Sequence, residues 1–351
     1  LGLLVVVRQD HGLALLGQGA DRRRQLSTGG AAHCVVTATC GCVLRRCENQ
    51  RLPHLLQDGG SLGIGLAEHS IAIAGDLHGQ WDSTDEALLK QLRPDALLVV
   101  GDLSDGNGRI PARLAALDLP LACILGNHDT GRDASGRTLR RQLDLLGERH
   151  CGWGLRELRP PGLAVVGARP ASAGGGFHLN PGATAVFGPV TLEESAQRIS
   201  AAALAADPAL PLLLLAHSGP SGLGSGRADL CGRDWKPPAC DWGDQDLALA
   251  IDRIRRHRPV PLVVFGHMHH RLKRGAGDRS TFCVDRAGTA YLNAACVPRH
   301  GLDAQGRDLR HFSWVELRDG QLQEVSHRWY TPAGELLYRQ TLHTARELLP
   351  C

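Results

Sequence analysis

The chain has 351 residues, of which 43% are hydrophobic and 21% charged, and these are the proportions of an ordinary globular protein with a sizeable core. The net charge of +3 is small for this length, and we find no basic stretch with interleaved aromatic residues, so the sequence does not indicate a nucleic-acid partner. No apolar run reaches the roughly 18 residues of a membrane-spanning helix, so we expect no membrane partner either.

The 11 cysteines do not suggest a disulfide framework, because such frameworks belong to small secreted domains that cannot build a core of this size. Cys123 and Cys283 lie inside apolar runs, where a free thiol behaves as a small hydrophobic side chain. We therefore expect reduced thiols and a cytoplasmic location.

Residues 1–69 differ from the rest, with arginine-rich patches, few acidic residues and no sustained helical or strand period. Their cysteines lack the close pairs of a zinc site; these are Cys34, Cys40, Cys42 and Cys47. The chain begins with Leu1 and its single methionine is Met268, so we expect a fragment, a processed chain or a misassigned start. We predict a poorly ordered or non-native extension over 1–69 and one domain over 70–351.

The first part of this domain alternates buried strands with amphipathic helices. Strands are predicted over 71–74, 96–100 and 121–125, each an apolar run that ends in a polar turn. Helices are predicted over 83–92, 111–117 and about 139–146; a capping box from Ser83 to Glu86 opens the first, and Gly147 ends the third. This alternation predicts parallel strands with functional groups at their carboxyl ends.

The second part begins with the same pattern and then changes to short strands joined by turns. Strands are predicted over 155–158, 163–167, 212–216 and 262–265, and helices over 191–206 and 244–256, with a long loop at 218–243. Further strands are predicted over 281–284, 290–293, 312–317 and 321–325, the last two joined by an Asp-Gly turn. We expect an α/β fold of four layers, in which two packed mixed β-sheets are flanked by helices.

Five of the predicted strands end in polar side chains that suit metal ions. The residues at these ends are Asp76 and His78, Asp102, Asn127 and His128, His217, and His267 and His269. Seven of these eight side chains are good ligands for divalent first-row metals, being carboxylate or amide oxygens and imidazoles. Seven ligands are too many for one tetrahedral zinc, but they fit two ions about 3.5–4 Å apart that share a carboxylate.

Taken in order, these motifs resemble the five motifs of the calcineurin-like metallophosphoesterase superfamily. The matching stretches are Gly75–Gly79, Gly101–Asp105, Gly126–Asp129, His217 after its strand, and Gly266–His269. The resemblance covers residues 71 to about 270 and implies the two-sheet metallophosphoesterase sandwich, with the terminal strands completing it. It implies an enzyme, a hydrolase that acts on the ester bond of a small phosphomonoester or phosphodiester.

The same resemblance implies the role of each residue. One metal would be bound by Asp76, His78, Asp102 and His269, and a second by Asp102 as a bridge with Asn127, His217 and His267. The two ions would be Mn, Fe, Zn or Mg, and they would activate a hydroxide for attack on phosphorus. His128 would assist the leaving group, and Asp105, or alternatively Asp129, would orient that histidine.

The sequence departs from the protein-phosphatase branch at Gly106, where that branch has an arginine that grips the phosphate. A protein serine/threonine phosphatase is therefore the less favoured enzyme, and a non-catalytic scaffold with this fold is the third alternative. Arg169, Arg233 and Lys236 lie in loops from which they could replace the arginine, and His270 is expected to be an exposed bystander. Residues 232–246 resemble a cyanobacterial and plastid subgroup, and nothing in the sequence indicates an oligomeric state.

Overall fold

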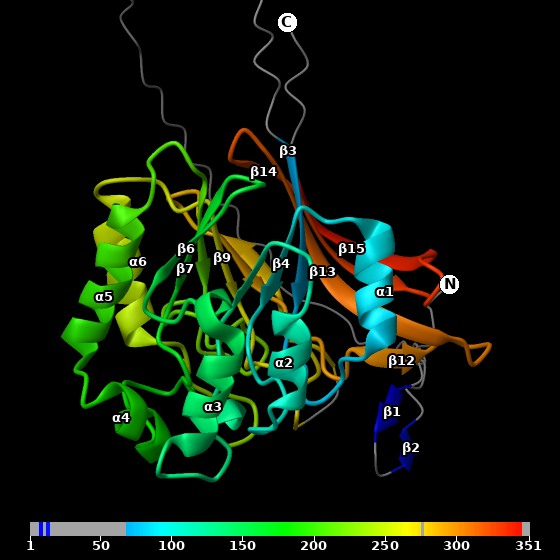
Figure 1. The fold of residues 1–351 in the computed structure, drawn as a ribbon, viewed down its shortest axis with the longest axis horizontal. Helices are drawn as coiled ribbons and strands as arrows, with labels where there is room; N and C mark the ends of the chain where they lie inside the picture. Colours follow the sequence, from blue (N-terminus) through cyan, green and yellow to red (C-terminus); the bar gives the residue numbers. More distant parts are fainter. Residues whose placement is uncertain (1–6, 10–11, 15–67, 275–276, 346–351) are drawn as a thin grey trace, which may run out of the picture. The chain divides into compact units, whose positions relative to one another are not determined.

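Two mixed β-sheets form the framework of this computed structural model, which describes residues 7–9, 12–14, 68–274 and 277–345 (Figure 1). The seven-stranded sheet contains β3 (Glu68–Ala74), β4 (Ala96–Val99), β5 (Leu121–Cys123), β12 (His300–Leu302), β13 (Asp308–Arg318), β14 (Gln321–Tyr330) and β15 (Leu336–Thr344). The six-stranded sheet contains β6 (Leu155–Leu158), β7 (Leu163–Gly167), β8 (Leu212–Leu215), β9 (Leu262–Phe265), β10 (Phe282–Val284) and β11 (Ala290–Asn293). Separately, β1 (Val7–Gln9) and β2 (Gly12–Ala14) pair with each other in antiparallel fashion.

The parallel strands form one side of the seven-stranded sheet and the centre of the six-stranded sheet. The seven-stranded sheet runs β15-β14-β13-β3-β4-β5, with β12 paired to β13, and the strands β3, β4 and β5 are parallel. The six-stranded sheet runs β10-β11-β9-β8-β7-β6, in which β7, β8, β9 and β11 are parallel. Each sheet therefore presents the carboxyl ends of several strands at one edge.

Six α-helices cover the outer faces of the two sheets. They are α1 (Ser83–Leu92), α2 (Arg109–Ala115), α3 (Arg137–Leu146), α4 (Pro181–Phe187), α5 (Leu192–Ala205) and α6 (Gln245–Arg255), with short 3-10 turns η1 (His128–Thr130) and η2 (Gly147–Arg149), all within the described ranges. Apolar side chains of α1, α2 and α3 pack on the seven-stranded sheet, and those of α5 and α6 on the six-stranded one.

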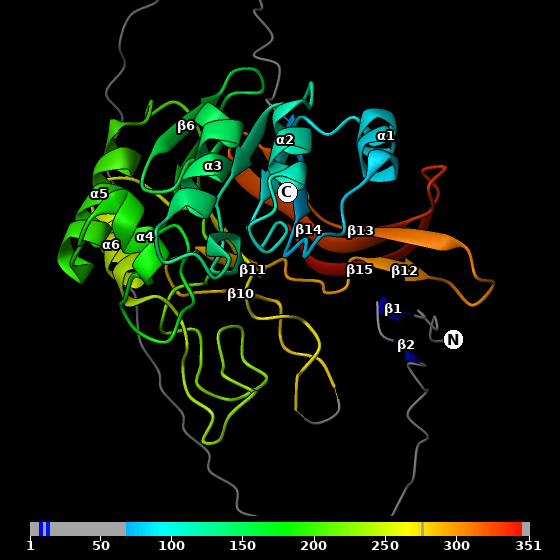
Figure 2. The ribbon, with the colours of Figure 1, turned by 60° about the horizontal axis from the view of Figure 1, so that its bottom comes forward.

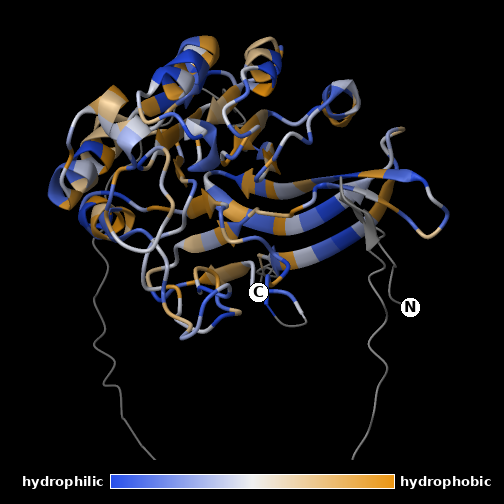
Figure 3. Cartoon of the chain, turned by 90° about the horizontal axis from the view of Figure 1, so that it is seen from below, coloured by the Kyte–Doolittle hydropathy of each residue, from blue (hydrophilic) through white to orange (hydrophobic). Residues whose placement is uncertain are grey.

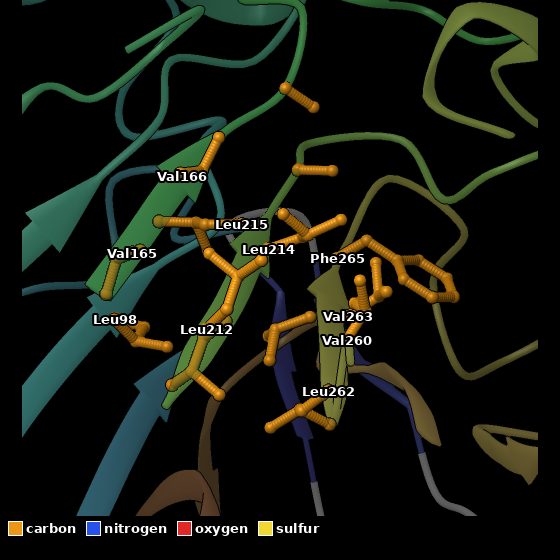
Figure 4. Packing of buried hydrophobic residues seen from close by; sticks show 14 of the residues in the cluster. Leu98, Val165, Val166, Leu212, Leu214, Leu215, Val260, Leu262, Val263 and Phe265 are labelled. Carbon is orange, nitrogen blue, oxygen red and sulfur yellow. The ribbon is translucent and has the colours of Figure 1, made fainter. Parts of the chain in front are cut away.

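The side-chain alternation of β3 shows how the layers are built. Ile71 and Ile73 join the hydrophobic cluster between the two sheets, whereas Ala72 and Ala74 join the cluster beneath α1, α2 and α3. Figure 4 shows the cluster between the sheets, where Leu98 of β4 lies beside Val165 of β7. The predicted four-layer sandwich of two mixed sheets flanked by helices is thus confirmed.

Most predicted elements occur close to their predicted bounds, although β13 begins four residues earlier and β14 ends five residues later than predicted. The capping box of α1 starts one residue earlier than predicted, because the Asp82 side chain accepts from the backbone N–H of Thr84, and Asp85 accepts from that of Asp82. The short helix α4 and strands β12 and β15 were not predicted. The edge strand β15 is largely exposed and polar, so it lacks a hydrophobic period, and Figure 3 shows hydrophilic residues along the long strands.

The structure describes only part of the predicted N-terminal extension. Glu68 and His69 already belong to β3, so the sheet begins two residues before the predicted domain boundary. Apart from these and from β1 and β2, the extension lies outside the described residues, as do its four cysteines. None of the helices in the described ranges combines the length and apolar character that crossing a bilayer requires.

Candidate metal centre

The polar residues at the strand ends come together where the carboxyl ends of the two sheets meet. Asp76 and Asp102 follow β3 and β4 of one sheet, and His217 and His267 follow β8 and β9 of the other. The Nδ1–H of His217 donates to the carbonyl oxygen of Val100 at 2.7 Å, which joins the ends of β8 and β4. Residues from both halves of the sandwich therefore form one cluster.

The first group of ligand atoms comes from Asp76, His78 and His269, which lie within 4.8 Å of one another. The Nε2 atoms of His78 and His269 face each other at 3.3 Å, and Nε2 of His269 is 3.5 Å from Oδ2 of Asp76. His78 Nε2 is also 3.8 Å from Oδ2 of Asp102. Imidazole nitrogens and carboxylate oxygens that face a common point are the usual ligands of zinc, iron and manganese.

The second group comes from Asp102, His217 and His267, and it includes Asn127. His217 Nε2 lies 3.4 Å from Oδ1 of Asp102 and 3.0 Å from Oδ1 of Asn127. Nε2 of His267 is buried and has no hydrogen-bond partner among the described residues. A buried polar atom without a partner is costly, so this nitrogen fits a site that is completed by a cation.

Hydrogen bonds to backbone carbonyls orient two of the imidazoles. Nδ1 of His217 is bonded to Val100, and the His267 ring donates to the carbonyl of Ala173, which also accepts from Nε1 of Trp242 at 2.9 Å. With one ring nitrogen occupied in this way, the Nε2 atom of each ring faces the other ligands. Sequence reasoning missed Trp242 and both carbonyls, because a backbone acceptor leaves no residue signature.

The loops around the centre are joined to each other by Arg279. Its Nε donates to the carbonyl of His269 at 2.9 Å, and its Nη1 donates to the carbonyls of Asp229 and Gly232 at 2.7 and 2.8 Å. Figure 2 shows the long loop of residues 216–244 beside the loop that follows β9. Arg279 thus anchors the backbone of His269.

Main-chain N–H groups hold the two buried carboxylates in place. The His267 N–H donates to both carboxylate oxygens of Asp76, at 2.9 and 3.1 Å, and the His128 N–H donates to Oδ1 of Asp102 at 2.9 Å. Among the described residues, the side-chain contacts of these carboxylates are with imidazoles and not with arginine or lysine. Two buried carboxylates that share a cluster of imidazoles fit a site for divalent cations.

The backbone at these strand ends is strained. Five predicted site residues have positive φ angles between 38° and 65°: Asp76, His78, Asp102, Asp105 and His267. They make up five of the nine non-glycine residues with positive φ in the described part of the chain. Residues with a Cβ atom avoid this region, and such conformations gather where geometry serves a function.

The charge states of the side chains also fit metal binding. Burial, together with His217 for His267 and His78 for His269, lowers the pKa of both imidazoles to about 3, so they are neutral ligands near pH 7. Burial raises the pKa of Asp76 to about 7. Burial alone would lower the pKa of His217, but the adjacent carboxylate of Asp102 outweighs it and raises that pKa. The cluster therefore favours added positive charge, which a divalent cation supplies.

His128 lies at the exposed rim of the centre and is paired with Asp105. Its Nδ1 is 2.8 Å from Oδ1 of Asp105, and the two side chains are 52% and 67% exposed. Asp129, the alternative partner, is instead fully buried and accepts from the N–H groups of Leu103 and Gly126. Ligand atoms of His78, Asp105 and His128 also lie within 4.8 Å of one another, in a more exposed arrangement than the other two groups.

The three loop cations that the sequence suggested as phosphate ligands differ in their contacts and burial. Arg169 is buried and pairs with Asp244 at 2.5 Å and Asp246 at 3.1 Å, so the expectation that it could grip a substrate is wrong. Arg233 packs over the ring of Trp242 and donates to the carbonyl of Pro238. Lys236 is exposed in the same loop.

His270 is a further correction, because it is not an exposed bystander. Its Nε2 lies 2.9 Å from the carbonyl oxygen of Asn293, and its ring centroid is 4.6 Å from that of His327. Burial lowers the pKa of His270 to about 4, so it is a neutral, packed imidazole at neutral pH.

Comparison with known proteins found one family match and several similar solved structures. The family model described as calcineurin-like phosphoesterase matches residues 69–271, whereas no curated protein matches the sequence. Similar solved structures include a dimetal phosphatase from Danio rerio (13% identity, 79% of this chain and 99% of that chain, TM-score 0.45). They also include a purple acid phosphatase from yellow lupin, Lupinus luteus (14%, 78% and 54%, 0.41), and GAP50, an anchor in the inner membrane complex of Plasmodium (12%, 80% and 90%, 0.41).

The matched region contains all five polar strand ends, from Asp76 to His269, and it spans more than half of the chain. The chain belongs to the calcineurin-like phosphoesterase family.

Proposed function

We propose that this protein hydrolyses a small phosphate ester, a phosphomonoester or phosphodiester, with the help of two divalent cations. The observation that supports this most directly is the meeting of two ligand groups, one around His78 and His269 and one around His217 and His267. Asp102 lies within 4 Å of imidazoles from both groups, as a carboxylate shared by two ions would.

The proposed ligands follow the two groups. Asp76, His78 and His269 would hold one cation, and Asn127, His217 and His267 the other, with Asp102 between them. Two cations bound there would supply positive charge to the phosphoryl oxygens and would lower the pKa of a nearby water molecule. Both effects are what the hydrolysis of an anionic ester requires, because water is a weak nucleophile and the ester repels anions.

His128 is proposed to donate a proton to the departing oxygen. Its Nδ1 is engaged by Asp105, which leaves Nε2 available. As the bond between phosphorus and the leaving oxygen breaks, that oxygen takes the electron pair and accepts the proton from Nε2. General-acid assistance of this kind contributes about 10²–10⁴-fold to the rate.

A phosphoprotein substrate is not favoured, because Gly106 stands where the protein-phosphatase branch has an arginine. Gly106 has a φ of 88°, and a Cβ atom there would lie 2.6 Å from the methyl group of Thr138. A side chain at this position would therefore have to adopt an unfavourable backbone conformation and displace the Thr138 methyl group.

The test is hydrolysis of 4-nitrophenyl phosphate and bis(4-nitrophenyl) phosphate by the purified protein with added Mn²⁺. We expect turnover by the wild-type protein, strongly reduced turnover by Asp102→Asn and His128→Ala, and about two metal ions per wild-type chain by elemental analysis. His128→Ala should keep its metal, because His128 is not a proposed ligand. Wild-type turnover no higher than that of the two variants would refute the proposal, and near-zero metal content would favour the scaffold alternative.

A further inference from the structure

A small cavity opens beside the first ligand group and extends away from it. Its volume is about 170 Å³, and its wall is formed by His78, Gly79, Ser104, Asp105, Asn107, Arg109 and Ile110. The polar side chains on this wall belong to His78, Ser104, Asp105, Asn107 and Arg109. The cavity therefore reaches from a proposed metal ligand, past the partner of His128, to an arginine at the start of α2.

Most polar groups on the wall are already used within the protein. Ser104 Oγ donates to the carbonyl of Asn107, Oδ1 of Asn107 accepts from the Arg109 N–H, and Asp105 is paired with His128. The exposed guanidinium of Arg109 differs, because no hydrogen bond or ion pair joins it to any described residue. By contrast, Arg113, one turn further along α2, pairs with Glu86 at 2.7 Å.

Asp105 and Arg109 place opposite charges on the wall of the cavity. Asp105 is an exposed carboxylate, and its negative charge repels an anion that enters the cavity. Arg109 supplies a permanent positive charge and a planar set of N–H donors that match phosphate oxygens. Sequence reasoning did not single out Arg109, because only the folded loop brings it to the same cavity as His78.

We propose that Arg109 binds a non-bridging phosphoryl oxygen of the substrate and so sets the affinity of the site for the phosphate group. This inference rests on the proposed function, because it assumes that a phosphoryl group occupies the site next to His78. In this arrangement the ester oxygen leaves toward His128, while the guanidinium holds the group being transferred.

The experiment measures binding of inorganic phosphate to the Mn²⁺-loaded protein by titration calorimetry, together with kcat and KM for 4-nitrophenyl phosphate. Arg109→Ala is expected to weaken phosphate binding and to raise KM by about 10- to 100-fold, which corresponds to the loss of a charge-assisted hydrogen bond. Its kcat should change less than its KM. The phosphate affinity and KM of Arg109→Lys should fall between those of the wild-type protein and Arg109→Ala, because lysine keeps the charge but not the planar set of donors.

Arg113→Ala is the matched control, because it removes the same charge from the same helix at a residue that does not line the cavity. Its phosphate affinity should stay within about twofold of the wild-type value, since the charge of Arg113 is already paired with Glu86 and its side chain does not line the cavity. Thermal unfolding of each variant establishes that it is folded.

The outcomes separate this inference from the proposed function. Equal phosphate affinity of Arg109→Ala and Arg113→Ala would overturn the role of Arg109, whether or not the wild-type protein turns over. Selective loss of phosphate binding in Arg109→Ala, without turnover by the wild-type protein, would retain the anion site and refute the hydrolase. Absence of phosphate binding by the wild-type protein would overturn the inference.

Discussion

The glycine at position 126 provides the sharpest test of the geometry of the metal centre. A Cβ atom added to Gly126 would lie 2.3 Å from Oδ1 of Asp102 and 2.6 Å from Cε1 of His217, whereas ordinary contacts begin at 3.4 Å. It would also lie 2.7 Å from the backbone nitrogen of Asp102. In Gly126→Ala the proposed bridging carboxylate and a second ligand must therefore move.

The size of this movement sets the expected loss of activity and of metal affinity. Both side chains must shift by roughly 1 Å to restore normal contacts, and displacements of this size at a reacting centre cost about 100-fold in rate. Both side chains are fully or almost fully buried, so neither can rotate into solvent to relieve the contact. We expect kcat/KM to fall by about 100-fold or more, and metal affinity by about 10- to 100-fold.

The assay compares metal content at a fixed free Mn²⁺ concentration with hydrolysis of 4-nitrophenyl phosphate. Gly154→Ala is the matched control, since a Cβ atom there meets its nearest neighbour, the carbonyl oxygen of Cys151, at an ordinary 3.5 Å, and Gly154 is remote in sequence from the ligands. If Gly126→Ala binds two Mn²⁺ ions and turns over like the control, the close approach of Asp102 and His217 to this backbone is not needed for function, and the reasoning fails.

Three further predictions concern the rim and the buried ion pairs. Asp105→Asn should lower kcat about 10-fold with metal content unchanged, because it weakens the orientation of His128 without removing the proton donor; loss of bound metal would make Asp105 a ligand instead. Arg169→Met should lower the free energy of unfolding by about 3–5 kcal/mol in urea denaturation and leave the KM of the folded protein unchanged; a raised KM would restore Arg169 as a substrate ligand. Burial alone would raise the pKa of Asp85, but Arg299 outweighs it and holds that pKa below its usual range. The pair therefore stabilises the fold above about pH 4, and this stabilisation fades as the pH falls further. The stability difference between wild type and Asp85→Asn, measured in urea, should accordingly narrow below about pH 4, and a difference independent of pH would contradict this assignment.

The elements of the fold followed from local patterns in the sequence. Strands β7 and β9 were predicted to the residue, because each is a fully buried, uninterrupted apolar run. The bounds of β6 and β11 were also predicted to the residue. The edge strand β15 and the short helix α4 were missed, since β15 is largely exposed and α4 spans only seven residues. These elements are fixed by pairing and packing with distant parts of the chain, not by a repeating pattern of their own.

The candidate site shows the same division between local and distant information. Motif spacing placed Asp76, His78, Asp102, His267 and His269 at strand ends, and the parallel order of the strands brought them together. It did not separate Asp105 from Asp129 as the partner of His128, because both lie within a few residues of the turns and only the direction of each side chain in the folded loops distinguishes them.

Residues that are close neighbours along the chain were thus enough to predict most strands and turns and the proposed metal-ligating side chains. The tertiary structure decided which groups meet. The hydrogen bonds between Asp76 and His267 join residues 191 positions apart, and the bond from His217 to Val100 spans 117 positions. It also decided that Arg169 is buried in ion pairs whereas Arg109 faces the cavity, since burial and charge pairing arise only when distant segments pack together.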